Sequence, residues 1–223
     1  MQSIKKVRQQ NPSHYQRRKL ESSTTDELRS ASPTPDGRIN RSVITRKKIV
    51  EALKELVYEG CLSPTAEQVA HRAKIGLRTV FRHFDDVSSL YSEMSSDFES
   101  LLAPVINARL VGESWQDRLM HSLELRAGLY DRIAAMYLAA QVHRHQSTVV
   151  AENIARDVAR LRAISRHVLP ASVQQNAVVF ETLDLLMSMD AWVRLRRDQH
   201  LSANDALKVV RLGVKAVLET IAS

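Results

Sequence analysis

A short segment that follows residue 76 carries polar side chains at a spacing suited to contacts with DNA. Val80 and Phe84 lie four residues apart, so a helix through them would turn both side chains inward. The other face of that helix then carries Arg78, Thr79, Arg82 and His83. Arginine and threonine can bind guanine acceptors, phosphate oxygens and thymine methyl groups. The spacing therefore predicts a helix that presents its polar face to a major groove.

The residues before this helix indicate how it is positioned. Val69, Ala70 and Ala73 mark a preceding short helix whose small alanines permit a close crossing. Thr65 is a good N-cap for it. Residues 74–76 form a break of turn length. Together the segments predict a helix-turn-helix. An ordinary surface helix with a solvated polar face is the alternative, and the crossing alanines weigh against it.

The composition narrows the class of protein. The chain has 223 residues, enough for one or two domains with a real core. Its single cysteine, Cys61, excludes an internal disulfide framework and a cysteine-rich zinc module, and it fits a reducing compartment. We expect no membrane span, because no segment approaches roughly 18 uncharged apolar residues, and no secretory signal. The chain has only six glycines and six prolines, and this low number favours an all-α protein over a turn-rich β fold.

The positive charge is concentrated near the N-terminus. Of the net charge of +7, six units lie within the first 95 residues. Residues 1–40 are rich in Ser, Thr, Gln, Lys and Arg without a helical or strand period, which predicts a disordered basic arm and linker. Its roles stay open: DNA affinity through counterion release, insertion into a minor groove, or no contact at all. A transit-like peptide is a weaker alternative, because no amphipathic stripe accompanies the acid-free first 20 residues.

The apolar periodicity predicts helices throughout the rest of the chain, about nine in all. We expect a three-helix head at residues 41–95, beginning with an amphipathic helix from Ser42 to Gly60, and a second helical domain at 96–223. Gly128 is a candidate break within the helix that opens at Ser114. The other helices are expected at 87–101, 148–169, 172–197 and 202–221.

The helix-turn-helix segment of the sequence resembles that of the TetR family of bacterial transcriptional regulators. The matching stretches are Pro64–Ala70, Ala73–Phe84 and the pair Leu90-Tyr91. Together with the amphipathic helix that ends at Gly60, the resemblance covers about 55 residues. The order Thr-Val-Phe-Arg-His-Phe after a helix with crossing alanines is its most specific part.

The resemblance implies a DNA-contact role for a set of residues in and before the second helix of the motif. Thr65, Thr79 and His83 would bind phosphate oxygens, and Leu77 and Arg78 would face bases. Phe81 stands where tyrosine is usual and Arg82 could supply a compensating phosphate contact. The full set is Thr65, Gly76, Leu77, Arg78, Thr79, Phe81, Arg82 and His83.

Three departures from the family pattern put the phosphate map in doubt, though not the motif. Lys74 replaces a turn glycine, at a cost of ~1 kcal/mol if its φ is positive. Gly76 stands where a serine often caps the second helix, and Val87 stands where a phosphate-binding lysine is common.

The resemblance also implies that residues 96–223 form a homodimer and enclose a small-molecule pocket. The last two predicted helices, about 172–197 and 202–221, would build a four-helix interface across a two-fold axis. That symmetry predicts a near-palindromic operator in double-stranded DNA. An effector would shift the spacing of the two heads away from the one that fits consecutive grooves.

The pocket candidates are bulky residues of the middle helices, and core packing is the simpler explanation for each. Their weak polar content faintly favours an apolar or amphipathic effector. The candidates are Phe98, Leu102, Trp115, Met120, Leu123, Tyr137, Phe180 and Met187.

Metal, cofactor and catalytic roles are not expected. His143 and His145 are two residues apart and would point in different directions on a helix, and no nucleotide-binding or nucleophile motif occurs. The sequence thus predicts a cytoplasmic, nucleoid-associated, non-enzymatic regulator, a repressor rather than an activator. An architectural DNA-binding protein without effector is the second hypothesis, and an all-α enzyme is the third. The operator, target genes and effector cannot be derived from the sequence.

Overall fold

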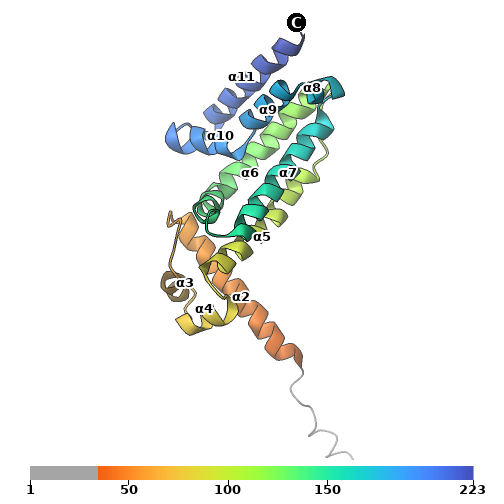
Figure 1. Ribbon diagram of the computed structural model, residues 1–223. Coiled ribbons are helices and arrows are strands. Elements are labelled where there is room, and N and C mark those ends of the chain that lie inside the picture. Colours follow the sequence, from red (N-terminus) through yellow and green to blue (C-terminus); the bar gives the residue numbers. More distant parts are fainter. Residues whose placement is uncertain (1–34, 223) are drawn as a thin grey trace, which may run out of the picture. The chain divides into compact units, whose positions relative to one another are not determined.

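A computed structural model describes residues 35–222 of the chain, and all regular elements within that range are helices (Figure 1). This confirms the predicted all-α class. None of these helices is long and apolar enough to cross a membrane. The elements, in chain order, are α2 (Pro35–Tyr58), α3 (Ala66–Arg72), α4 (Leu77–His83), α5 (Val87–Ile106), α6 (Trp115–His143), α7 (Thr148–Val168), α8 (Ala171–Gln175), α9 (Ala177–Leu186), α10 (Met189–Val193), the π-helical turn η1 (Arg194–Asp198) and α11 (Ala203–Ala222).

The chain divides into two units, Met1–Ile44 and Thr45–Ser223. Both sites described below lie in the second unit. The predicted disordered arm falls largely on residues 1–34, outside the described residues. Helix α2 begins at Pro35 instead of Ser42, so residues 35–40 are helical and the expectation of a linker was wrong for them. Proline suits the first position of a helix, because its fixed φ matches the helix and its missing N–H would have no partner there.

The predicted helix-turn-helix is formed by α3 and α4, which pack against each other. The buried side chains Val69, Ala70 and Ala73 of the first segment meet Val80 and Phe84 of the second, and all five belong to one hydrophobic core. Helix α5 follows after Asp86, whose carboxylate accepts a hydrogen bond from the backbone N–H of Ser89 (2.7 Å) and thereby caps it.

Helices α5, α6 and α7 pack side by side and form the central part of the second unit (Figure 1). Helix α5 includes Pro104, which was expected to lie beyond its end. Helix α6 runs without interruption through Gly128, so the candidate break there was wrong. Gly128 is exposed, and the apolar residues on either side of it hold the helix in place through the core. A single glycine costs a helix only ~1 kcal/mol, which such packing offsets.

The predicted helix at 172–197 is divided into α8, α9, α10 and η1, and this is the largest correction to the expected elements. The breaks occur at residues that cap the next helix. The Asn176 side-chain oxygen accepts a hydrogen bond from the Val179 N–H (3.3 Å), and the Ser188 hydroxyl accepts one from the Ala191 N–H (3.1 Å). Asn and Ser compete with helix continuation because their side chains satisfy the N–H groups of a new first turn.

The last helix, α11, packs against α6 and α9. Ser202 caps it by accepting a hydrogen bond from the Asp205 N–H (3.1 Å). Its inner face carries the buried residues Ala206, Val210 and Val214. A second apolar face, described below, stays exposed.

Candidate nucleic-acid interface and ligand cavity

The first helix of the helix-turn-helix is fixed by a capping box. The Thr65 Oγ1 accepts a hydrogen bond from the Gln68 N–H (3.3 Å), and the Gln68 Oε1 accepts one from the Thr65 N–H (2.8 Å). This arrangement satisfies two backbone donors at the helix start. The Thr65 O–H donates to the Glu67 carboxylate, so a contact with a DNA phosphate would have to replace this hydrogen bond.

The turn between the two helices uses an uncommon backbone conformation. Lys74 has a φ of +52°, the left-handed region that favours glycine. The Ile75 N–H donates to the Ala70 carbonyl (3.0 Å) and closes the turn. Gly76 begins α4 with an ordinary φ of −73° and without a side-chain cap. The sequence thus places a lysine where glycine is favoured and a glycine where it is not required.

Helix α4 exposes a basic and aromatic face. Val80 and Phe84 are only 2% exposed, whereas Phe81 on the opposite face is 47% exposed. Arg78 and Arg82 are exposed beside Phe81. This is the amphipathic arrangement predicted from the spacing, and it leaves two guanidinium groups free to meet a polyanion.

The other predicted contact residues of α4 are less accessible. Thr79 and His83 are half-buried, and burial lowers the pKa of the His83 imidazole, with Arg82 and Arg46 adding to the effect. A neutral His83 would act on a phosphate as a hydrogen-bond donor and not as a cation. Leu77 is half-buried and packs against the core.

Arg46 of α2 holds the end of α4 and was not anticipated from the sequence. Its Nε and Nη2 donate to the two carboxylate oxygens of Glu93 on α5 (3.0 and 2.7 Å), and its Nη1 donates to the His83 carbonyl. The guanidinium also lies 4.1 Å from the centre of the Phe84 ring. The hydrogen bonds that Arg46 donates to Glu93 raise the pKa of Arg46. One side chain thus connects three helices at the C-terminus of α4.

A second group of contacts joins the helix-turn-helix to the C-terminal end of α6. The Tyr91 ring on α5 stacks on the His143 ring, and the Tyr91 hydroxyl donates to the Leu62 carbonyl (3.2 Å). The Ser63 hydroxyl lies 3.2 Å from the His143 Nε2. Leu62 and Ser63 belong to the loop that leads into α3, so His143 connects the end of α6 to this loop.

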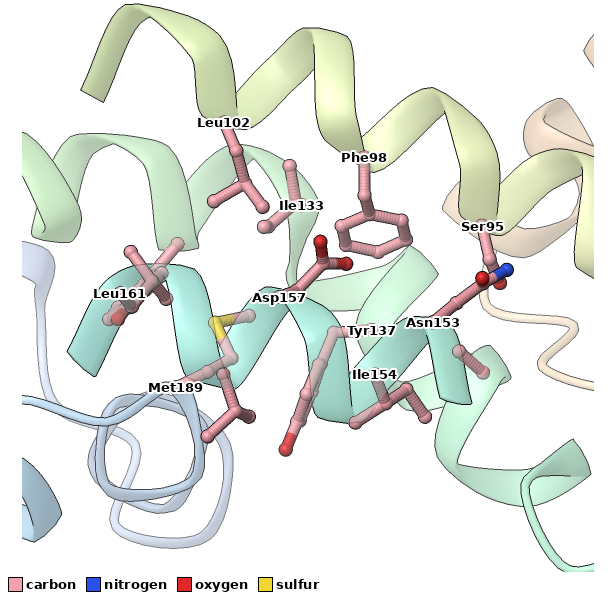
Figure 2. Close-up of a pocket in the computed structure, with 13 residues that line it drawn as sticks. Ser95, Phe98, Leu102, Ile133, Tyr137, Asn153, Ile154, Asp157, Leu161 and Met189 are labelled. Atoms are coloured by element: carbon pink, nitrogen blue, oxygen red, sulfur yellow. The ribbon is translucent and has the colours of Figure 1, made fainter. Parts of the chain in front are cut away.

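A narrow apolar cavity of about 50 Å³ lies between α5, α6 and α7. Figure 2 shows Phe98 and Leu102 of α5 pointing toward α7, with the Asp157 carboxylate directed back toward α5. Ile133 and Tyr137 of α6 complete one side. The lining is almost wholly hydrocarbon and aromatic, which suits an apolar ligand group.

A larger and more polar cavity of about 260 Å³ adjoins it. The two share Tyr130, Tyr137, Val158, Leu161 and Met189 in their walls. Burial raises the pKa of Tyr130 to about 12, so its hydroxyl stays protonated and donates to the Met187 carbonyl (3.1 Å). The polar wall of this cavity contains Arg126, Arg162, Glu181, Asp184 and Asp190.

The structure distributes the predicted pocket residues over several places. Phe98, Leu102 and Tyr137 line the narrow cavity, and Met187 lines the larger one. The other four line neither of these two cavities. Leu123 and Phe180 are buried in the core, and Trp115 and Met120 are half-buried against it.

Sequence patterns carry little signal for the polar residues of these sites. Arg46, Arg126 and Asp157 occur at helical positions that an amphipathic pattern assigns to a solvated face. Only the tertiary arrangement shows that Arg126 is buried and that Asp157 faces an apolar cavity. His143 was weighed as a metal ligand beside His145, whereas its observed partners are an aromatic ring and a hydroxyl group.

Comparison with known proteins supports this architecture. No protein-family model matches the sequence, and a comparison with curated protein sequences gives no match. Solved structures do match. A transcriptional regulator from Pseudomonas aeruginosa PAO1 is 16% identical, with a TM-score of 0.57 over 86% of this chain and 95% of that chain.

Two further structures are named as TetR-family proteins. One, from Syntrophomonas wolfei, is 12% identical, with a TM-score of 0.58 over 78% of this chain and 94% of its own. The other, from Marinobacter aquaeolei VT8, is 18% identical, with a TM-score of 0.51 over 81% of this chain and 96% of its own. The chain therefore has the fold of TetR-family transcriptional regulators, as the resemblance of its helix-turn-helix implied.

Proposed function

We propose that the protein is a transcriptional regulator that binds double-stranded DNA through α4. The observation that carries this proposal is the exposed face of α4, where Arg78, Phe81 and Arg82 stand opposite the buried Val80 and Phe84. A helix held in this way by a preceding helix and a short turn can enter a major groove. The TetR-like fold of the chain supports the same function.

In this proposal the chain has an N-terminal arm before α2, a DNA-binding head that ends near residue 95, and an effector-binding and dimerisation part at 96–223. The regulator would act as a repressor in the cytoplasm, on the nucleoid. An enzymatic role is not part of the proposal. Whether the arm contacts DNA is left to the test below.

The second copy of the chain would dock on an apolar face of α9 and α11. Val178 and Leu185 on α9 are 77% and 65% exposed, and Leu212 on α11 is 72% exposed. Large apolar side chains exposed on two adjacent helices are typical of a surface that is covered by a partner. A two-fold axis at this face would produce the four-helix interface expected from the sequence and a near-palindromic operator.

The cavities would hold a small-molecule effector that releases the DNA. Ile133 and Tyr137 of α6 line the narrow cavity, and His143 lies at the end of the same helix against Ser63. A ligand that displaces α6 would therefore act on the loop before α3. Binding energy that differs between the two positions of α6 would shift the population of heads that fit the operator.

The proposal is tested by selecting bound sequences from a random DNA duplex pool with the purified full chain at near-physiological salt. We expect one near-palindromic site. Arg78→Ala should then cost ~1–3 kcal/mol on that site and relax the preference for one base pair. Arg109→Ala is the matched control, because Arg109 is an exposed arginine in the loop after α5 and lies outside the proposed interface.

The outcomes separate the two DNA-binding hypotheses. Recovery of no consensus, with binding that collapses as salt rises, would contradict the regulator and support the architectural protein. Equal losses for Arg78→Ala on all DNA sequences would contradict the base-reading role of Arg78. Deleting residues 1–34 tests the arm separately, since a DNA-binding arm must lower the affinity and the salt dependence when it is removed.

A further inference from the structure

The wall of the larger cavity contains a buried cation, Arg126, that forms no ion pair with any carboxylate of the described residues. Arg126 on α6 is 1% exposed. Its Nη2 donates to the Leu161 carbonyl (2.7 Å) and to the Ser165 hydroxyl (2.9 Å), and the guanidinium also hydrogen-bonds the Tyr130 hydroxyl, so all these acceptors are neutral. Its Nε is buried and has no hydrogen-bond partner within residues 35–222. In most folded proteins a buried charged group is paired, so this one calls for an explanation.

The acids in the same cavity wall are already bound by other groups. Arg162 donates to Asp184 (2.6 Å) and to both oxygens of Glu181 (2.8 and 2.6 Å). Asp190 accepts a hydrogen bond from the Tyr137 hydroxyl (2.6 Å). Glu181 and Asp190 are exposed, whereas Asp184 is half-buried and is held by Arg162. They moderate the positive potential of the cavity, but none of them forms an ion pair with Arg126 within the described part of the chain.

A purely structural role for Arg126 would not need the charge. Removing a guanidinium from water is costly, and hydrogen bonds to neutral oxygens offset only part of that cost. An uncharged side chain of similar volume would pack at this position at lower cost. The charge and the unpartnered Nε therefore suit a group that enters the cavity from outside.

We propose that the cavity binds a small amphipathic carboxylate, with its anionic oxygens on Arg126 and its hydrocarbon part among Phe98, Leu102 and Ile133. This inference rests on the proposed effector-binding function and names the chemical class of the effector. A carboxylate matches a guanidinium in geometry and charge. The polar site and the apolar cavity adjoin at Tyr130 and Leu161, and the proposed ligand would extend from one into the other past these residues.

The test measures binding of decanoate to the full chain by calorimetry, with 1-decanol and decylamine as probes of equal chain length. We expect decanoate to bind roughly 10- to 100-fold more tightly than either, the range expected for a charge-assisted hydrogen bond. Arg126→Met should remove this preference and leave the affinity for 1-decanol unchanged. Arg166→Met is the matched control, since Arg166 covers the Phe180 ring at 4.2 Å and lines neither cavity.

If Arg126→Met does not fold, the wild-type chain still decides the question. Decanoate labelled with ¹³C at the carboxyl carbon is titrated with acid in the bound state and followed by NMR. A carboxylate paired with a buried guanidinium stays ionised at pH values at which free decanoate is protonated. A bound carboxyl that protonates at the same pH as the free acid, or a decylamine affinity equal to that of decanoate, overturns the proposal.

A DNA-binding measurement separates this inference from the proposed function. If decanoate binds through Arg126 but leaves operator affinity unchanged, the ligand class stands and the effector role fails. If a ligand releases the operator equally well from the wild type and from Arg126→Met, the effector role stands and the carboxylate site fails.

Discussion

The phenol ring of Tyr91 and the imidazole ring of His143 stack with their centres 3.6 Å apart and their planes inclined by 26°. Tyr91 lies on α5, at the edge of the helix-turn-helix, and His143 lies at the last residue of α6. Their polar atoms bind the same short loop, because the Tyr91 hydroxyl donates to the Leu62 carbonyl and His143 contacts the Ser63 hydroxyl. The pair thus joins α5 to α6, and both residues also bind the loop that precedes α3.

This contact should make the stability of the protein sensitive to mild acid. Burial lowers the pKa of His143, so the folded protein keeps it neutral below pH 6.5, where the unfolded chain begins to protonate it. The unfolded state then binds more protons, and the free energy of unfolding falls as the pH drops from about 6.5 toward the folded pKa. Above pH 6.5 His143 is neutral in both the folded and the unfolded state, so it adds nothing to the pH dependence of the free energy of unfolding. We expect His143→Phe, which keeps a ring against Tyr91, to lose less stability between pH 7.5 and 5.5 than the wild type does.

Thermal unfolding at the two pH values measures this difference. The effect is a fraction of the ~1.4 kcal/mol per pH unit that one full proton would give. His145→Gln is the control, because His145 is exposed two residues further along the chain. An identical pH dependence in the wild type and His143→Phe would show that His143 is not the group responsible.

The connection that Arg46 makes between α2, α4 and α5 predicts energetic coupling with Glu93. Both side chains are more than a third exposed, so the ion pair itself contributes at most ~0.5–1 kcal/mol. A double-mutant cycle with Arg46→Met and Glu93→Gln should give a coupling energy in that range. Arg46→Met should also increase hydrogen exchange at the C-terminal amides of α4, because the His83 carbonyl loses its donor.

Arg72→Met provides the comparison for Arg46. Arg72 also binds carboxylates, those of Glu55 and Glu59, but it connects α3 to α2 and has no bond to α4. Its substitution should leave exchange in α4 unchanged. Equal exchange in α4 for both variants would refute the assignment of Arg46 as the residue that holds this helix.

Lys74 offers a site at which a substitution should stabilise the protein. Its φ of +52° is strained for a side chain with a Cβ, so Lys74→Gly should raise the free energy of unfolding by ~1 kcal/mol. For a chain of this size that corresponds to about 2–4 °C in the melting temperature. Lys74→Ala removes the same charge and retains the Cβ, and it should give no such increase. A melting temperature that rises equally for both would indicate charge and not backbone strain as the cause.

The helix-turn-helix could be predicted from the sequence because its signals are local. The spacing of Val80 and Phe84, the crossing alanines and the capping residue Thr65 each lie within a few residues of the feature that they determine. Local propensity, apolar pattern and turn length agree there, which is the condition for reading structure from one segment. The resemblance to the TetR family, carried by the same residues, extended that reading to the rest of the fold.

The breaks in the C-terminal half could not be placed in the same way. An apolar period runs through 172–197 without interruption, and Asn176 and Ser188 are residues that a helix interior also tolerates. Tertiary packing decides whether such a residue caps a new helix or continues the old one. Arg126 shows the same limit for the site, because the sequence does not distinguish a buried arginine from a solvated one.

The exposed apolar face of α9 and α11 gives the last prediction. Leu212 is 72% exposed on α11, and Gly213 beside it lets α11 approach the Leu186 side chain of α9, where an added Cβ would lie 3.3 Å away. If a second copy covers this face, Leu212→Glu buries an unpaired carboxylate in the interface and should convert the dimer to a monomer. Light scattering after gel filtration measures the mass directly. Affinity for the palindromic site should fall on the order of 100-fold, because a monomer loses the second half-site.

Val111→Glu introduces the same charge at a 59% exposed valine in the loop before α6 and should leave the dimer intact. A wild-type chain that is monomeric at concentrations where it binds its selected site would contradict the interface, and a Leu212→Glu chain that stays dimeric would place it elsewhere on the surface.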